Sequence, residues 1–193
     1  GEPNKVLKKS LSIDDDTFVM SILARYEESK GLDFLLNSIK LLKERTSRKF
    51  VLLIAGDGIL FEDMGELIEK LNLQDCVKQL GFRKDTADIL SISDLYINSS
   101  KCLEALSFAM VEALVNGLPI VATNIGGNPD IVSPQNDCGT LVEYGDCDAF
   151  AEAVREYIEN EELLKKRSEN AKAAAENVFN LDKLLDDTFK LYM

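Results

Sequence analysis

Short apolar runs alternate with amphipathic segments along most of the chain. The runs are about four to eight residues long and rich in Val, Ile and Leu, which is typical of strands buried on both faces. The segments between them carry apolar residues at helical spacing, as at positions 32, 35, 36, 39 and 42. Strands alternating with helices predict an α/β fold with a doubly wound parallel sheet of about six strands. The expected strands are 17–24, 50–55, 76–83, 94–98, 120–123 and 139–142.

The pattern also predicts where helices begin and end. Ser107 is an expected N-cap, and Gly117 with Pro119 ends the same helix. Asp146 or Asp148 is expected to cap a later one. Residues 1–16 are polar and expected to be irregular, so the acidic run at 14–16 is interpreted as a solvated turn. Helices are expected at 32–45, 59–73, 85–93, 107–116, 149–159, 161–176 and 177–193.

Length and composition narrow the class of protein. At 193 residues, with 46% apolar and 29% charged residues, residues 1–193 fit one globular α/β domain. A net charge of −12 argues against nucleic acid as a partner. We find no signal peptide and no apolar run of about eighteen residues, and we expect a cytoplasmic protein.

The residue types present exclude several kinds of chemistry. The four cysteines show no C-x-x-C spacing and the chain has no histidine, so a zinc site and Ser-His or Cys-His catalysis are not expected. Gly56-Asp57-Gly58 follows a strand, but Phe61 stands where a dinucleotide fingerprint needs its third glycine. A tight turn that requires glycine for backbone reasons explains this loop better than a NAD site.

The segment 98–131 carries the clearest functional signal. A helix beginning near Ser107 would start at the carboxyl end of a strand, where open α/β sheets bind ligands. The N–H groups of its first turn and the helix dipole favour an anion such as a diphosphate. Glu104 and Glu112 flank that position and could accept hydrogen bonds from sugar hydroxyls.

The segment resembles a known motif in five features taken together: Glu104, Glu112, Gly117-Leu118-Pro119, the strand 120–123 and Gly126-Gly127. It is the E-x7-E motif in the C-terminal, donor-binding domain of retaining GT-B glycosyltransferases (glycosyl transferases group 1). The resemblance covers nearly the whole chain and implies a Rossmann-like half of a GT-B fold.

The resemblance also implies roles for individual residues. Arg25 and Lys30 would bind the donor diphosphate, Glu104 the donor sugar and Glu112 the ribose. Ala24 and Ala105 stand where the family usually has glycine, which leaves the basic pair and the backbone donors in place. The remaining expected substrate contacts are Gly31, Gly56, Arg83, Ala105, Leu106, Ser107 and Phe108, although an exposed basic turn explains Arg83 equally well.

The implied function is transfer of a sugar from a nucleotide-diphosphate donor to a hydroxyl acceptor, in polysaccharide or glycoconjugate biosynthesis. No cofactor or metal is expected, because two cations can stabilise a leaving diphosphate. The acceptor-binding N-terminal domain would be missing, so we expect the isolated domain to be inactive. The resemblance leaves membrane association open: any peripheral association with the inner face of the membrane would occur through that missing half. Helix 177–193 could reach back to a partner domain. A nucleotide-sugar epimerase and a non-catalytic nucleotide-binding module remain alternatives.

Overall fold

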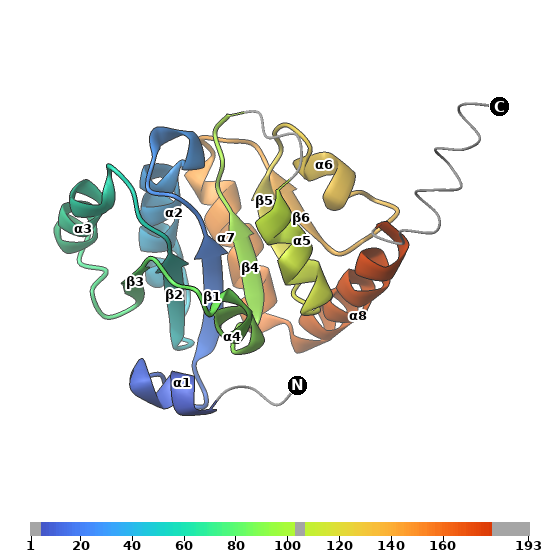
Figure 1. Ribbon diagram of the computed structural model, residues 1–193, viewed down its shortest axis with the longest axis horizontal. Helices are drawn as coiled ribbons and strands as arrows, with labels where there is room; N and C mark the ends of the chain where they lie inside the picture. Colours follow the sequence, from blue (N-terminus) through green and yellow to red (C-terminus); the bar gives the residue numbers. More distant parts are fainter. Residues whose placement is uncertain (1–4, 103–106, 179–193) are drawn as a thin grey trace.

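The computed structural model of the chain describes residues 5–102 and 107–178. Its centre is a six-stranded sheet with the order β3-β2-β1-β4-β5-β6, in which every neighbouring pair is parallel (Figure 1). This architecture confirms the predicted doubly wound sheet. The strands are β1 Phe18–Leu23, β2 Phe50–Ala55, β3 Val77–Gly81, β4 Leu95–Asn98, β5 Ile120–Thr123 and β6 Gly139–Val142.

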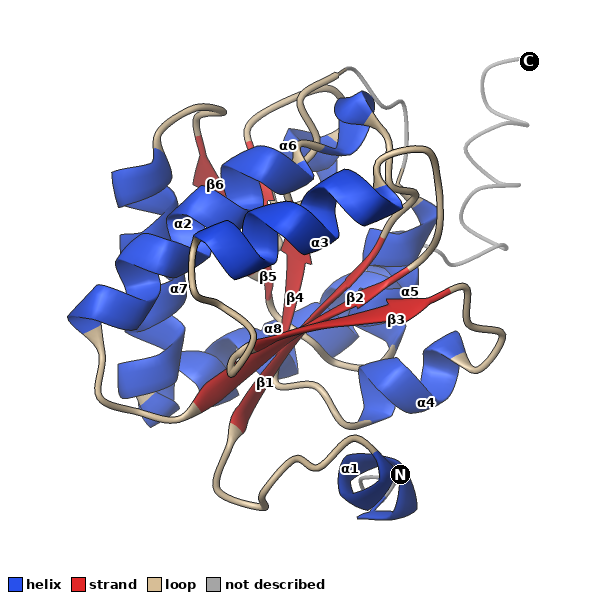
Figure 2. Ribbon diagram, turned by 90° about the vertical axis from the view of Figure 1, so that its left-hand side faces the viewer, coloured by secondary structure: helices blue, strands red, loops and turns tan. Residues whose placement is uncertain are grey.

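Helices cover both faces of the sheet. Figure 2 shows α2, α3 and α7 on one side and α1, α4, α5 and α8 on the other. The helices are α1 Lys5–Ser10, α2 Leu32–Arg45, α3 Phe61–Lys70, α4 Thr86–Ser91, α5 Phe108–Val115, α6 Asn128–Ile131, α7 Cys147–Glu159 and α8 Glu161–Val178, with a 3₁₀ turn at Glu28–Lys30.

Successive side chains of each strand point to opposite faces of the sheet, so the apolar core is divided between the two helical layers. Met20 and Leu52 pack in the cluster that contains the apolar faces of α2 and α7. Their chain neighbours Val19 and Val51 pack in a second cluster with residues of α1 and α4. Because successive side chains of a strand point to opposite faces, each strand contributes to two cores and reads as a continuous apolar run.

Most predicted elements are confirmed, several to the residue. Strands β2, β5 and β6 and helix α2 have the predicted bounds. The expectation for residues 1–16 was wrong, because Lys5–Ser10 forms α1. Its Leu7 is buried against the sheet, and six residues are too few for a helical period to show in the sequence. Most of the predicted helix 177–193 lies outside the described residues.

The strand order puts a topological switch point between β1 and β4, where a ligand-binding crevice is expected. After β1 the chain moves outward to β2 and β3, then returns to build β4, β5 and β6 on the opposite side of β1. The loops that leave the carboxyl ends of β1 and β4 therefore run in opposite directions. Such a switch point is where open α/β sheets bind ligands, so it positions the candidate site.

Candidate functional site

Backbone hydrogen bonds join the exits of the first three strands. Tyr26, after β1, donates its N–H to the carbonyl of Asp57, after β2, at 3.0 Å. Leu60 donates its N–H back to the carbonyl of Tyr26 at 3.0 Å. Gly56 donates its N–H to the carbonyl of Gly81, at the end of β3, at 2.8 Å. These loops form one continuous rim at the carboxyl edge of the sheet.

Gly56 is glycine because the β1 exit comes very close to it. Its φ is +147°, and a Cβ built there would lie 1.9 Å from the carbonyl oxygen of Ala24. A side chain at this position would collide with backbone, which agrees with the tight-turn interpretation of Gly56-Asp57-Gly58. The loop thus borders the β1 exit, next to Arg25.

The Lys30-Gly31 turn packs against the exit of β4. The hydroxyl of Ser99 donates to the carbonyl of Lys30 at 2.8 Å, and the N–H of Lys101 donates to the carbonyl of Ser29 at 2.9 Å. Gly31 has φ +59° and forms the N-cap of α2. The turn predicted to hold the diphosphate follows β1, and these hydrogen bonds fix it to the exit of β4 across the switch point.

Arg25 offers a cation at this rim. Its side chain is 75% exposed and forms an ion pair with Glu27, with Nη2 and Oε1 3.0 Å apart. Glu27 also accepts a hydrogen bond from the Ser29 hydroxyl at 2.7 Å. A surface ion pair of this kind contributes about 1 kcal/mol or less, so an incoming diphosphate can compete for the guanidinium. Lys30 is partly exposed in the same turn.

The start of α5 faces the same edge, after β4. Ser107 is the N-cap residue, as predicted, but its side chain makes no capping hydrogen bond. Instead its hydroxyl accepts from Nδ2 of Asn98 at 3.4 Å, a long contact. The first-turn N–H groups are consequently not capped by this side chain, which favours anion binding. The adjacent Phe108 is 75% exposed.

The predicted end of this helix is confirmed in detail. Gly117 has φ +73°, its N–H donates to the carbonyl of Leu114 at 2.8 Å, and the N–H of Leu118 donates to that of Ala113 at 2.9 Å. This pair of bonds is a Schellman motif, which terminates a helix and satisfies its last carbonyl groups. The chain then turns directly into β5.

The remaining predicted residues are less closely joined to this rim. Glu112 is exposed on α5, one turn after its start. Arg83 donates two hydrogen bonds to Asp85, at 2.8 and 2.6 Å, and this carboxylate raises the pKa of the guanidinium. Glu104, Ala105 and Leu106 lie outside the described residues.

Two residues near the turn were not singled out from the sequence. Lys101 follows β4 and places Nζ 3.4 Å from Oε2 of Glu28, which raises the pKa of the ammonium group. Tyr144, after β6, packs its ring on Phe34 with centroids 4.9 Å apart and borders Gly31. The only available signal for Lys101 was a cation shortly after a predicted strand, which many solvated turns share.

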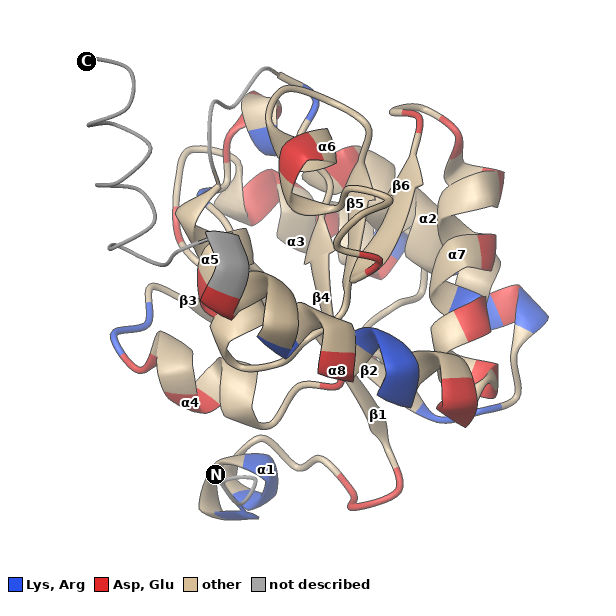
Figure 3. Ribbon diagram, turned by 90° about the vertical axis from the view of Figure 1, so that its right-hand side faces the viewer, with Lys and Arg blue, Asp and Glu red and all other residues tan. Residues whose placement is uncertain are grey.

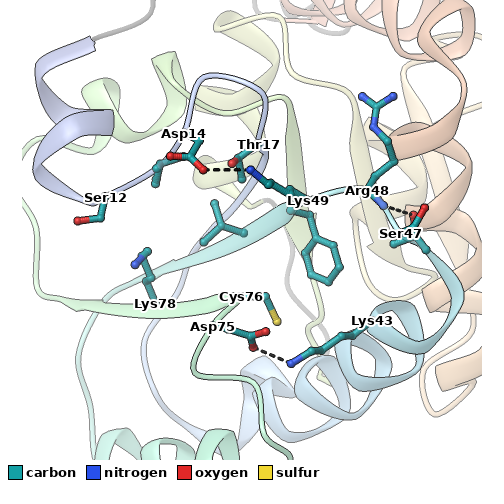
Figure 4. Close-up of a pocket in the computed structure, with 14 residues that line it drawn as sticks. Ser12, Asp14, Thr17, Lys43, Ser47, Arg48, Lys49, Asp75, Cys76 and Lys78 are labelled. Carbon is teal, nitrogen blue, oxygen red and sulfur yellow. Dashed lines mark hydrogen bonds and ion pairs between the residues drawn. The ribbon is translucent and has the colours of Figure 1, made fainter.

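The opposite edge of the sheet contains a cavity of about 440 Å³ (Figure 4). Two of the four cations that line it form ion pairs, since Lys43 lies 2.7 Å from Asp75 and Lys49 lies 3.2 Å from Asp14. Burial raises the pKa of the Cys76 thiol, which lines the cavity, to about 12, so it stays protonated near neutral pH. Asp14 thus belongs to an ion-paired turn at the amino edge, away from the crevice.

Charges elsewhere are dispersed. Figure 3 shows an acidic segment on α6 and both signs on α8. Within residues 5–102 and 107–178, no group of three or more His, Cys, Asp or Glu side chains is arranged to hold a metal ion. None of the described helices is both long enough and apolar enough to span a bilayer.

Comparisons with known proteins agree with this fold. The chain is 26% identical over 186 residues to N-acetyl-alpha-D-glucosaminyl L-malate synthase of Bacillus anthracis, covering 96% of this chain and 48% of the relative. It is 29% identical over 188 residues to UDP-Gal:alpha-D-GlcNAc-diphosphoundecaprenol alpha-1,3-galactosyltransferase of Escherichia coli, with the same coverage. The chain spans about half the length of these curated relatives.

A similar arrangement occurs in solved structures. Anabaena HepE in complex with UDP superposes with a TM-score of 0.84 at 24% identity, over 96% of this chain and 51% of that one. A glycosyltransferase from Rickettsia africae gives a TM-score of 0.82 at 25% identity, over 97% and 50%. The family model for glycosyl transferases group 1 matches residues 4–174. The chain therefore belongs to the glycosyl transferases group 1 family and has the architecture of one half of a GT-B enzyme.

Proposed function

We propose that this chain is the donor-binding half of a retaining glycosyltransferase. The complete enzyme transfers a sugar from a nucleotide-diphosphate donor to a hydroxyl acceptor in polysaccharide or glycoconjugate biosynthesis. The names of similar proteins support a nucleotide-sugar donor, since one relative is named for UDP-Gal and HepE was solved with UDP and with UDP-glucose.

The observation that supports this proposal is the contact, at the β1/β4 switch point, between a basic turn and the strand exit that leads to a helix start. The turn containing Arg25 and Lys30 touches the β4 exit through Ser99 and Lys101. The same exit leads to the start of α5. A diphosphate in the crevice would face basic side chains on one side and first-turn N–H groups on the other.

This arrangement suits a leaving diphosphate. Negative charge develops on the phosphate oxygens as the sugar departs, and fixed cations and N–H donors stabilise that charge without a metal. Glu104 is assigned to the donor sugar and Glu112 to the ribose. The Gly81–Arg83 exit, beside Gly56, is assigned to the nucleobase side.

The proposed reaction uses no protein nucleophile. The donor phosphate helps to activate the acceptor on the same face of the sugar, so that the anomeric configuration is retained. The acceptor site belongs to the half of the enzyme that the longer relatives possess in addition. The isolated chain should accordingly bind donor without appreciable turnover.

Calorimetric titration with UDP, GDP and ADP tests the phosphate site directly. The double variant Arg25→Gln/Lys30→Gln removes two cations from the rim. Charge-assisted hydrogen bonds contribute about 1.5–3 kcal/mol each, and the low end applies because Arg25 is largely exposed. Their combined loss of about 3 kcal/mol corresponds to roughly a hundredfold weaker affinity for the nucleotide that binds.

The chain supplies a charge-matched control at the other edge of the sheet. Arg48→Gln/Lys78→Gln removes the same net charge from residues that line the amino-edge cavity. Affinity in this variant should stay within about twofold of wild type, because charges beyond about 10 Å are screened at ordinary ionic strength. Equal losses in both variants would show that only net charge matters and would refute the assignment of Arg25 and Lys30.

A further inference from the structure

A group of buried polar side chains lies at the carboxyl ends of β4 and β5, next to the β1/β4 switch point. Asn98, Ser100, Thr123 and Asn128 are each at most 5% exposed and follow or end strands β4 and β5. The acceptor Oδ1 of Asn128 has no hydrogen-bond donor among the described residues. Burying polar groups opposes folding unless they are hydrogen-bonded, so apolar side chains would make a simpler core here.

These side chains tie the exits of β4 and β5 together. The hydroxyl of Thr123 donates to the carbonyl of Ser100 at 2.6 Å. Nδ2 of Asn128 donates to the carbonyl of Thr123 at 3.0 Å, and the N–H of Ser100 donates to Oδ1 of Asn98 at 3.1 Å. The Thr123 hydroxyl thus links β5 to the backbone after β4, over twenty residues earlier in the chain.

The backbone held in this way supports the ligand-facing elements on both sides. Ser99 and Lys101, which flank Ser100, hydrogen-bond to the carbonyls of Lys30 and Ser29. Asn98 donates to the hydroxyl of Ser107 at the start of α5. A shift of residue 100 would therefore change the distance between the basic turn and the helix terminus.

We propose that Thr123 is a positioning residue for nucleotide-diphosphate binding. Its side chain is fully buried and cannot reach a ligand in the crevice, so it acts through the Ser100 carbonyl. The hydroxyl fixes the position of the backbone of residues 98–101. This backbone in turn fixes the distance between the cations of the Arg25–Lys30 turn and the N–H groups at the start of α5. The inference rests on the proposed function, because it assumes that a diphosphate binds between these elements.

Substitution of one hydroxyl tests the idea with little change in volume. Thr123→Val removes the donor and should weaken affinity for UDP, GDP or ADP, whichever binds wild type, by roughly five- to tenfold. Thr123→Ser restores the hydroxyl and should recover most of that loss. Thr140→Val is the matched control, since Thr140 also lies on a strand and its hydroxyl hydrogen-bonds to that of Tyr157 at 3.0 Å, partly buried and away from the β4 exit.

Amide hydrogen exchange in the free protein provides a readout that does not need nucleotide. Thr123→Val should speed exchange at Ser100 and Lys101, whereas Thr140→Val should leave both unchanged. If Thr123→Val binds nucleotide like wild type, or if Thr140→Val weakens binding as much, the positioning role is refuted. If wild type binds no nucleotide, the proposed function fails and the exchange rates alone decide whether Thr123 holds this loop.

Discussion

The most direct test of the rim geometry is the substitution Gly31→Ala. Gly31 adopts φ +59°, and a Cβ built on it would lie 2.3 Å from the carbonyl oxygen of Ser99. The same Cβ would lie 2.9 Å from Cε2 of Tyr144. Both the left-handed backbone and the packing against the β4 exit therefore oppose any side chain.

The two costs can be separated within this chain. The left-handed conformation costs a non-glycine residue about 1–2 kcal/mol. Forcing an extra methyl group into a packed site costs about 1–3 kcal/mol more, and here the neighbour is backbone that cannot rotate away. Gly81→Ala is the matched control, because Gly81 has φ +66° and a Cβ there would meet nothing within 4 Å.

Urea and thermal unfolding of both variants should resolve the difference. For a domain of this length, 1 kcal/mol corresponds to about 2–4 °C in Tm. Gly81→Ala should lose about 1–2 kcal/mol, and Gly31→Ala about 2–5 kcal/mol. Equal destabilisation of the two variants would show that the Lys30-Gly31 turn does not press on the β4 exit, and the argument for a joined rim would fail.

Two further predictions concern single carboxylates. Burial raises the pKa of Asp94, which accepts a hydrogen bond from the N–H of Val19 at 2.8 Å. Because a raised pKa means that the folded state binds the proton more tightly, any stability advantage of Asp94→Asn over wild type at pH 7 should shrink as the pH falls towards 4. A stability difference that stays constant with pH in urea unfolding would contradict this. Asp146 caps α7 by accepting from the N–H of Ala149 at 2.9 Å, so Asp146→Ala should lose about 1 kcal/mol, whereas the exposed Asp15→Ala should stay within about 0.5 kcal/mol of wild type.

The sequence alone was sufficient for the strands, the main helices and the glycine turns. Apolar runs and helical spacing are local properties, which is why β2, β5, β6 and α2 were predicted to the residue. Local rules also located the helix end at Gly117 and narrowed the cap of α7 to Asp146 or Asp148, of which Asp146 is the cap in the structure. These rules depend on neighbours in the chain, so they need no knowledge of the strand order.

Only the tertiary structure decided which of these parts touch. It made α1 a helix through the burial of Leu7 against the sheet, and it placed Thr123 under the β4 exit. Gly31 was expected to contact substrate, and only the fold places the Ser99 carbonyl against it. Such contacts join residues that are far apart in the chain, and they arise from the order of strands in the sheet, which no local pattern encodes.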